Sequence, residues 1–543
     1  MLYAGTLKYP FQFDDYNSIF NARQAINPAI QSWLPTLHDL RQHFFLPGRQ
    51  ISWLTFIMNY AIHGLWLPGY HLVNIAVHGT NSFLLFLILR QLCFYAYPRG
   101  VKPKHAFDAA CLLISLIFLC HPLAVNSVTY IIQRNGSLAT MFYLAAFFLY
   151  LRLRTPTSGK PFTVSQLTGW TGFIICGWLA IHCKQMAVTL PLVCVAAEWL
   201  IVQPNAAGRR RFFQALAAVF TVALLATVMT WKMGLWQTGN LTLGFHSKLL
   251  WSPFIHFLTE LRVFFWYWIY LVCPWPGWLS VQHEVSLSPG ILHLPTLSAL
   301  IFHLIMLAGA VYLAKKNRRL ASLGIFWFYL TLGPPYLFLP QRELLVEYKV
   351  YLAIPGLAMI IADFTAQLSN PATKSPVSHC YMNRQRLAMM AAVVIILFLC
   401  WGSGKRNAVF QNEESLWTDV IIKQPASFRA YNNRAMVYCK QRKYGQAFQD
   451  YTQAIAIHPQ YEVAYENRGN ISFLSGHYQN ALEDFSKAIS LIPEEPAFRQ
   501  QAALLHYKCA LSLKRLGREQ ESQREFDKAW ALNPGLQKHS QGR

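Results

Sequence analysis

Several carboxylate and cationic side chains of this sequence stand at the ends of apolar runs, where they could act on a substrate at a membrane surface. Asp14 and Asp15 are adjacent near the start of the chain, and Arg134, Lys184 and Lys349 each end or begin an apolar run. A carboxylate can accept the proton of an attacking hydroxyl, and cations can hold a departing phosphate. Because neighbouring carboxylates repel one another, one of them binds a proton more firmly, which suits a base. These residue types fit group transfer from a phosphate to a hydroxyl.

Each of these residues also has a purely structural interpretation. Aspartate is common before a helix, where it caps backbone N–H groups, and a lysine or arginine at a membrane edge often only extends its charge into the water. His121 precedes Pro122 at the end of an apolar run, and His71 and His78 share one helical face. No further carboxylate stands at ligand spacing from these histidines, so a divalent metal is not expected.

The elements that would carry these residues are membrane helices. Charged residues make up 13% of the 543-residue chain, against roughly 25% in soluble proteins. Apolar runs near the ~20 residues that cross a bilayer recur along the sequence. They predict ten spans, at residues 69–90, 107–128, 134–151, 165–183, 185–203, 212–231, 293–314, 320–338, 349–367 and 387–402.

The net charge of +23 follows the same pattern. Basic loops on the cytoplasmic side account for most of it, and contact with anionic lipid or a phosphate-bearing ligand is the alternative. Nucleic acid is not expected as a partner, because the basic residues are scattered between apolar segments and do not line one face. The loops that these residues mark as cytoplasmic hold Arg90, Arg99, Lys102 and Lys104, then Arg152, Arg154 and Lys160, then Arg209, Arg210 and Arg211, then Lys315, Lys316, Arg318 and Arg319.

The number of crossings constrains this topology. Three apolar segments lie between the last two basic loops, whereas two cytoplasmic loops must be joined by an even number of crossings. Residues 249–273 are therefore expected not to span, because His256, Glu260 and Arg262 interrupt them and charges at mid-bilayer are costly. The extracytoplasmic side then receives the first 68 residues, the turns at 121–133 and near Lys184, residues 232–292 and 339–348, and everything after Trp401.

From Ala430 the sequence repeats with a period of 34 residues, the period of tetratricopeptide (TPR) repeats. Small alanines let the two helices of each repeat pack closely, and a proline ends the second helix. A third, irregular unit ends at Asn533 and Pro534 in the manner of a capping repeat. Such arrays usually bind a peptide or protein, and a purely structural cap is the alternative. The residues that recur are Ala430, Tyr431, Asn433, Arg434, Tyr444, Ala447, Asp450, Ala454, Ile455 and Pro459, as Ala464, Tyr465, Asn467, Arg468, Tyr478, Ala481, Asp484, Ala488, Ile489 and Pro493.

Over nearly its whole length the sequence resembles the O-mannosyltransferase-like membrane proteins that carry TPR repeats, including their bacterial relatives. The order and spacing of six stretches carry the resemblance: FQFDDYNSI at 11–19, GRQISWLTFIMNYAIHGLWLPGYHLVNIAVHGTNSFLLF at 48–86, HPLAVNSVTYIIQRNGSLATMFYL at 121–144, CKQMAVTLPL at 183–192, EYKVYL at 347–352 and RNAVFQNEESLWTDVIIKQP at 406–425. Two departures stand out. The family places a span before its acidic loop, so either the start codon lies upstream of Met1 or that span is absent. Gln185 stands where many relatives have an acidic residue, which puts a salt bridge there in doubt.

The resemblance implies an all-α polytopic domain of the GT-C glycosyltransferase type followed by a TPR solenoid. It implies a polyprenyl-phosphate sugar as donor, a protein acceptor or partner held by the TPR repeats, and a bacterial inner membrane with the repeats in the periplasm. Asp14 and Asp15 are then the candidate catalytic residues. The candidate donor-phosphate or substrate residues are Arg49, His121, Arg134, Lys184, Arg342, Glu347, Lys349 and Tyr351.

The expected domains are a first extracytoplasmic loop at 1–68, a membrane domain at 69–402, a linker with its first helix at 403–428 and the TPR domain at 429–543. The alternative function is a non-catalytic TPR scaffold for envelope or pilus assembly. A scaffold has no need of acidic and basic residues in several loops on one face. A transporter or flippase is a third possibility, but it would place its polar residues near mid-span.

Overall fold

The computed structural model describes residues 2–12, 15, 49–97, 104–154, 164–202, 252–337, 343–368, 378–493 and 495–536. Within these ranges every regular element is a helix. Contacts divide the chain into two compact units, Met1–Gln411 and Asn412–Arg543. The expected span at 212–231 and the residues Asp14 and Arg342 fall outside the described ranges.

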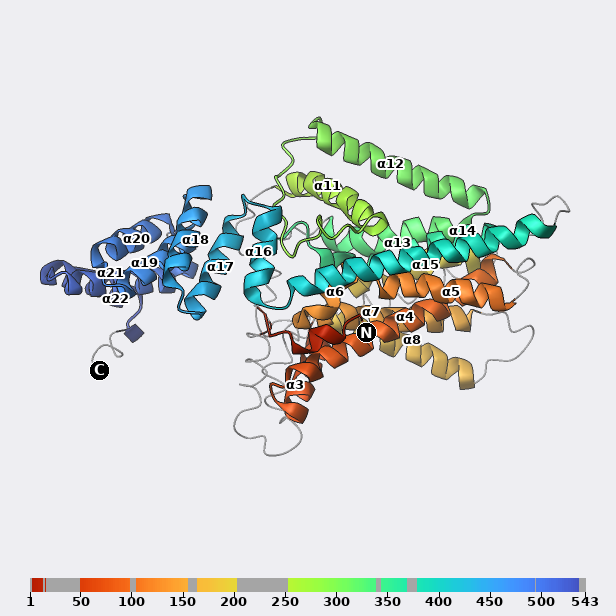
Figure 1. Ribbon diagram of the computed structural model, residues 1–543, viewed down its shortest axis with the longest axis horizontal. Helices are drawn as coiled ribbons and strands as arrows, with labels where there is room; N and C mark the ends of the chain where they lie inside the picture. The colour runs from red at the N-terminus through yellow and green to blue at the C-terminus, as the bar shows by residue number, and fades with distance from the viewer. Residues whose placement is uncertain are drawn as a thin grey trace, which may run out of the picture. The chain divides into compact units, whose positions relative to one another are not determined.

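The first unit is a bundle of long apolar helices that run side by side, as Figure 1 shows for α4, α5, α7, α13, α14 and α15. Its helices are α3 Gln50–His63, α4 Leu67–Ala96, α5 Lys104–Leu119, α6 Pro122–Thr129, α7 Arg134–Leu153, α8 Val164–Cys183, α9 Leu190–Ala197, α11 Pro253–Val272, α12 Leu294–Lys315, α13 Arg319–Tyr336, α14 Ile354–Leu368 and α15 Ser378–Val409. Short helices join them: η1 Ala4–Lys8, η2 Ile131–Gln133, η3 Gln185–Thr189, η4 Glu198–Val202 and η5 Glu347–Ala353.

Seven helical segments in the described residues are long and apolar enough to cross a membrane, or eight if one bent pair is a single span. These segments indicate an integral membrane protein. The count is lower than the ten spans that the sequence predicts, partly because 212–231 is not described. The expected span at 320–338 forms the helix α13, which is not among the seven. The seven are Leu67–Ala96, Ile131–Leu153, Val164–Cys183, Gln185–Val202, Leu294–Lys315, Glu347–Gln367 and Leu387–Val409.

The expected span at 107–128 is broken. Residues Asp108–Leu119 and Pro122–Thr129 form two helices that meet at 60°. Pro122 cannot donate a backbone hydrogen bond and so starts a new helix. His121 caps this helix, because its Nδ1 accepts from the Leu123 N–H at 3.3 Å and its Nε2 bonds the Leu271 carbonyl at 3.1 Å.

The helices differ in how much of their surface the bundle covers. The apolar stretches of α8, α12 and α15 are largely exposed, whereas those of α7 and α14 are mostly buried. Exposed side chains on α8, α12 and α15 include Trp178, Leu304 and Val394. Exposed apolar faces of this kind suit contact with lipid. Trp275 and Trp401 pack together with ring centroids 5.6 Å apart, and such aromatic groups favour the membrane–water interface.

Two glycines bring α13 and α14 into direct backbone contact. A Cβ on Gly356 would lie 2.5 Å from the Gly324 carbonyl oxygen, and a Cβ on Gly324 would clash with the Gly356 carbonyl oxygen. Small residues at facing positions let membrane helices approach closely. This contact sets the position of η5, because α14 continues directly from it.

The end of α15 holds three distant segments together. Arg406 pairs with Glu347 of η5 at 3.1 Å. Asn407 accepts from the Thr129 hydroxyl of α6 at 2.6 Å. The Phe410 carbonyl accepts from the Gln12 amide of the N-terminal segment at 2.6 Å. We call residues 406–410 the α15 anchor.

The second unit is a series of helical hairpins, visible in Figure 1 as α17–α22. Alanines at the helix crossings, such as Ala435 and Ala481, are completely buried. Each regular repeat also holds a paired arginine and aspartate, with Arg434 bidentate to Asp450 at 2.8 and 2.9 Å. The same pair recurs 34 residues on as Arg468 and Asp484. The helices are α16 Glu413–Lys423, α17 Phe428–Lys440, α18 Tyr444–Ile457, α19 Glu462–Leu474, α20 Tyr478–Leu491, η7 Pro496–Phe498, α21 Arg499–Arg515 and α22 Glu519–Leu532.

Candidate functional site

Acidic and cationic candidates meet at the start of α7. The Asp15 carboxylate is buried and accepts from the Ile132 N–H at 2.6 Å and from the Gln12 N–H at 3.0 Å. It therefore caps the 3₁₀ turn η2 that leads into α7, where a negative charge is favourable. One helical turn further on, a Cβ on Gly136 would lie 3.3 Å from the Lys184 ammonium. The start of α7 thus lies between Asp15 and Lys184.

Arg134, the first residue of α7, is completely buried and directs its donors at protein acceptors. Its Nε bonds the Asn74 side chain at 2.6 Å, and its terminal nitrogens bond the Tyr70 carbonyl at 2.9 Å and the Asn59 side chain. The guanidinium also lies 4.4 Å from the centre of the Phe56 ring. These contacts join α3, α4 and α7 and favour a structural role over a direct contact with phosphate.

Lys184 and Arg49 provide charge without a fixed partner. Neither side chain has a hydrogen-bond or ion-pair partner among the described residues. Lys184 is half-buried in the turn between α8 and η3, and its ammonium lies 4.5 Å from the centre of the Tyr348 ring. Burial, together with the positive charges of Arg49 and Lys349, lowers the pKa of Lys184 to about 7. Three cations therefore share one region and repel one another.

Local contacts explain how Arg49 and Lys184 come together. Arg49 precedes the first residue of α3. The Ser52 hydroxyl in the first turn of α3 donates to the Cys183 carbonyl at 3.4 Å, next to Lys184 in the chain. A cluster of cations with few counter-ions binds an anion well, because the anion relieves their mutual repulsion.

Lys349 is the most buried of the three cations. Its ammonium donates to the carbonyl oxygens of Glu343 at 2.5 Å and Leu344 at 3.0 Å, and lies 4.9 Å from the centre of the Tyr336 ring. We call Arg49, Lys184 and Lys349 the cation cluster. Tyr348 and Lys349 are neighbours in η5, so this short helix brings Lys184 and Lys349 together.

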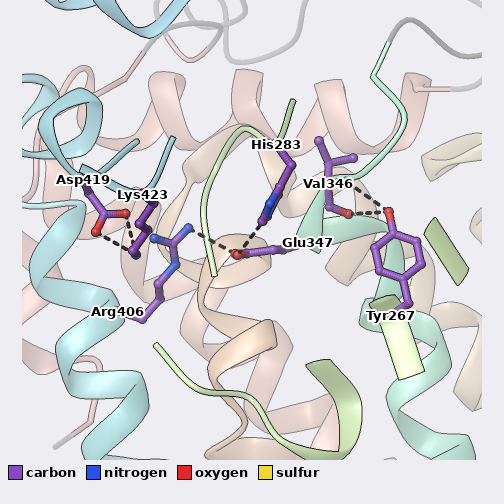
Figure 2. Close-up of polar contacts among 7 residues, drawn as sticks. All are labelled: Tyr267, His283, Val346, Glu347, Arg406, Asp419 and Lys423. Carbon is purple, nitrogen blue, oxygen red and sulfur yellow. Dashed lines mark hydrogen bonds and ion pairs between the residues drawn. The ribbon is translucent and has the colours of Figure 1, made fainter. Parts of the chain in front are cut away.

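The helix η5 directs three consecutive side chains at three different neighbours. A 3₁₀ helix has three residues per turn, so Glu347, Tyr348 and Lys349 leave it about 120° apart. Figure 2 shows Glu347 between Arg406 of the α15 anchor, at 3.1 Å, and His283, at 3.9 Å. Both Glu347 and Arg406 are completely shielded from solvent.

The two ends of η5 are fixed as well. The Tyr267 hydroxyl both donates to the Val346 carbonyl and accepts from the Val346 N–H, each at 3.0 Å, as Figure 2 shows. Tyr351 is completely buried, and its hydroxyl bonds His78 Nδ1 at 2.6 Å and the Asn81 amide at 3.1 Å. The other nitrogen of His78 bonds a backbone carbonyl. Tyr351 therefore fastens η5 to α4.

Of the predicted site residues, Asp15, Arg134 and the cation cluster lie around the start of α7 and η5. His121, Glu347 and Tyr351 are buried in the surrounding framework. Tyr348 and Arg406 carry no separate signal in the sequence, although both stand inside the quoted stretches. Glu260 interrupts an apolar run, and a charged residue at such a position is itself a signal of function. Among the described residues, no group of three or more His, Cys, Asp or Glu side chains is arranged to hold a metal ion.

Comparison with known proteins identifies the repeats and a group of relatives. Tetratricopeptide repeat models match residues 428–461 and 463–495. The chain is 24% identical over 456 residues to "Protein O-mannosyl-transferase Tmtc3" of Drosophila melanogaster, which covers 75% of this chain. It is also 24% identical over 482 residues to "Protein O-mannosyl-transferase TMTC4" of Mus musculus, covering 80% of this chain. The chain is a distant relative of the TPR-containing protein O-mannosyl-transferases.

The alignments with the TPR-containing O-mannosyl-transferases cover most of this chain but only part of the length of each relative. The aligned regions represent 48% of the fly protein and 62% of the mouse protein. A shorter stretch of 166 residues is 30% identical to "Protein O-mannosyl-transferase F38B6.6" of Caenorhabditis elegans. The long alignments extend well beyond the repeats, so the membrane unit shares in this homology.

Proposed function

We propose that this chain is a GT-C glycosyltransferase that moves a sugar from a polyprenyl phosphate to a protein hydroxyl on the extracytoplasmic side of a membrane. Mannose is the sugar suggested by the names of the relatives. The TPR unit would hold the protein acceptor or a partner. A bacterial inner membrane, with the repeats in the periplasm, is the proposed location.

The observation that carries this proposal is the cation cluster beside the start of α7. Lys184 and Arg49 lack hydrogen-bond and ion-pair partners among the described side chains. The Asp15 carboxylate binds the Ile132 N–H, one helical turn before Gly136, which lies beside the Lys184 ammonium. A phosphate would supply the negative charge that the cluster lacks. Cations held ready for a leaving phosphate stabilise the transition state without reorganisation.

The proposed reaction is a single displacement with inversion. The acceptor oxygen forms a bond to the anomeric carbon while the bond from that carbon to the phosphate oxygen breaks. The hydroxyl proton passes to a carboxylate, and the phosphate leaves with the electron pair towards Arg49, Lys184 and Lys349. Asp15 already accepts two backbone hydrogens, so we assign the proton to its neighbour Asp14 and a positioning role to Asp15.

Separate substitutions test these assignments. D14N, D15N and K184M would be produced in cells, their membrane insertion confirmed, and the transfer of labelled mannose from polyprenyl-phosphate mannose to protein measured by intact mass. D14N should abolish transfer, and K184M should raise the donor KM at least tenfold. T168A, on the exposed side of α8, is a control that should leave transfer unchanged.

Transfer at the wild-type level in D14N would show that the assigned base is wrong, and transfer at that level in D15N would remove the positioning role of Asp15. The scaffold alternative predicts a different pattern. In that case the wild-type protein would transfer no sugar with any polyprenyl-phosphate donor, while substitutions in the repeats would still disrupt an envelope assembly. The observation that supports this scaffold alternative is the match to TPR models at 428–461 and 463–495.

A further inference from the structure

A carboxylate that the proposed reaction does not use lies inside the membrane unit. Glu260 of α11 is completely buried, and neither of its oxygens has a hydrogen-bond partner among the described residues. Two other residues of α11 contact the same region, since His256 bonds the Tyr336 carbonyl at 3.0 Å and Tyr267 bonds Val346 at 3.0 Å. One side of α11 therefore faces Tyr336 at the end of α13 and Val346 at the start of η5.

The titratable groups around Glu260 come from three elements. Burial raises the pKa of Glu260 to about 8, and the charge of Lys349 in η5 acts against this rise. Glu260 in turn acts electrostatically on Tyr336 at the end of α13 and on Tyr267 of α11 itself. Glu260 and Lys349 do not form a direct ion pair among the contacts of the described residues, but charges interact strongly over longer distances where water is excluded. Glu260 thus influences Lys349 through space.

Because Lys349 is buried, its ammonium needs a nearby negative charge to stay protonated. An ammonium removed from water needs compensating negative charge, or it loses its proton. The two carbonyl acceptors of Lys349 supply only dipoles, and Lys184 adds repulsion. Glu343 also acts on Lys349, but its side chain is exposed and its charge is screened by salt. Among the described residues, Glu260 is thus the buried carboxylate that acts on Lys349.

We propose that Glu260 is a positioning residue that keeps Lys349 charged and ready to receive the donor phosphate. This inference rests on the proposed function, in which Lys349 belongs to the phosphate site. Glu260 touches neither phosphate nor sugar in this role. Because burial raises the pKa of Glu260 to about 8, its carboxylate forms mainly above that pH. There its negative charge retains the proton on Lys349 while the site is empty.

The test compares the pH dependence of lipid-phosphate binding in four proteins. Farnesyl phosphate would be titrated into the purified full-length wild type, E260Q, E260D and the double variant E260Q/K349R between pH 5.5 and 9. E260Q should bind like the wild type at the acidic end and at least tenfold more weakly above pH 8. E260D keeps the charge and should follow the wild type. An arginine at 349 stays protonated without help, so E260Q/K349R should regain binding above pH 8.

A control variant distinguishes the loss of the Glu260 charge from destabilisation caused by changing any buried carboxylate. Glu198 is also buried, but it pairs with Arg154 at 2.5 Å and bonds Tyr150, away from η5. E198Q should leave the pH profile of binding unchanged. A merely structural role for Glu260 would lower binding by E260Q equally at every pH, without rescue by K349R, and that result would overturn the inference.

The outcomes also distinguish this inference from the proposed function. If the wild type transfers sugar and E260Q binds the probe like the wild type across the pH range, the role of Glu260 is wrong and the function stands. If the wild type binds farnesyl phosphate with the predicted E260Q behaviour but transfers no sugar, the role stands and the function is wrong. If E260Q does not insert, failure of E260D and E260Q/K349R to bind in the predicted pattern overturns the inference.

Discussion

A buried lysine without a counter-ion is costly to a folded protein, and Lys184 has none among the residues that the structure describes. Its neighbours are a tyrosine ring, the backbone at Gly136 and two further cations. Residues held in unfavourable electrostatic surroundings are concentrated at functional sites. The same feature makes the charge state of Lys184 sensitive to pH in the physiological range.

The first prediction concerns stability and pH. Burial lowers the pKa of Lys184 to about 7 from an ordinary 10.5. Between these values the unfolded chain binds more protons than the folded one, so the free energy of unfolding should rise with pH from about 7 towards 10.5. Below pH 7 both states are protonated and the penalty is fully present. The unfolding midpoint of purified protein, measured from pH 6 to 9, should increase more steeply in the wild type than in K184M.

Phosphate binding should raise the pKa of Lys184 again, because a bound anion stabilises the protonated ammonium. Binding of a polyprenyl phosphate at pH 8 should therefore take up protons from the buffer. Calorimetry in buffers of different ionisation enthalpy would measure the uptake. Equal pH slopes for the wild type and K184M, or binding without proton uptake, would contradict the assigned environment of Lys184.

Elements in the membrane unit are held at fixed spacing by contacts that tolerate little change. The Gly324–Gly356 contact joins α13 to α14, and α14 continues from η5. Backbone atoms cannot give way as a flexible side chain can. The position of Lys349 and its neighbours in η5 therefore depends on two residues that have no side chain.

The second prediction tests this packing. G356A should separate α13 from α14 and lower the free energy of unfolding by about 1–3 kcal/mol, the usual cost of overpacking. G309A on α12 is the matched control, since a Cβ there meets nothing within 4 Å and alanine favours a helix. Unfolding midpoints in one detergent would compare the two. A midpoint for G356A equal to that of G309A would show that the helices are not in contact.

The third prediction concerns the buried ion pair between η5 and α15. E347Q leaves Arg406 charged in a dry environment and should destabilise the protein by roughly 3–5 kcal/mol. The double variant E347Q/R406M should recover part of that loss, because the buried guanidinium is removed together with the carboxylate. The half-exposed pair Arg90–Asp108 offers a control, since breaking such a pair costs about 0–1 kcal/mol. Additive effects of E347Q and R406M would mean that the two side chains do not interact.

At the scale of the whole molecule, the proposed function requires the repeats and the cation cluster to share one side of the membrane. Alkaline phosphatase fused after Arg543 should be active in a bacterial host, and the same enzyme inserted after Lys316 should be inactive. Green fluorescent protein at these two positions should give the opposite pattern. Activity after Lys316 but not after Arg543 would place the repeats in the cytoplasm and remove the basis for acceptor binding.

Sequence patterns predicted the helical class and the repeats well, because apolar runs and a fixed 34-residue period are properties of the chain itself. They also selected Lys184 and Lys349, which stand at visible boundaries of apolar runs. They could not reveal that Arg134 is saturated by Asn59, Asn74 and Tyr70, since those partners come from two other helices. The sequence did show Pro122 and a turn at 121–133, but the span expected at 107–128 still ran through the bend of 60° at His121.

The α15 anchor has a mechanical consequence. The chain leaves residues 406–410 and enters α16 directly, so tension on the repeats travels along the backbone to this turn. At this turn the α15 anchor is bound by an ion pair to η5, a hydrogen bond to α6 and a hydrogen bond to the N-terminal segment. A pull on the C-terminal end should thus be resisted as a single rupture event. When that event occurs, the framework that holds Glu347 would be released in the same step.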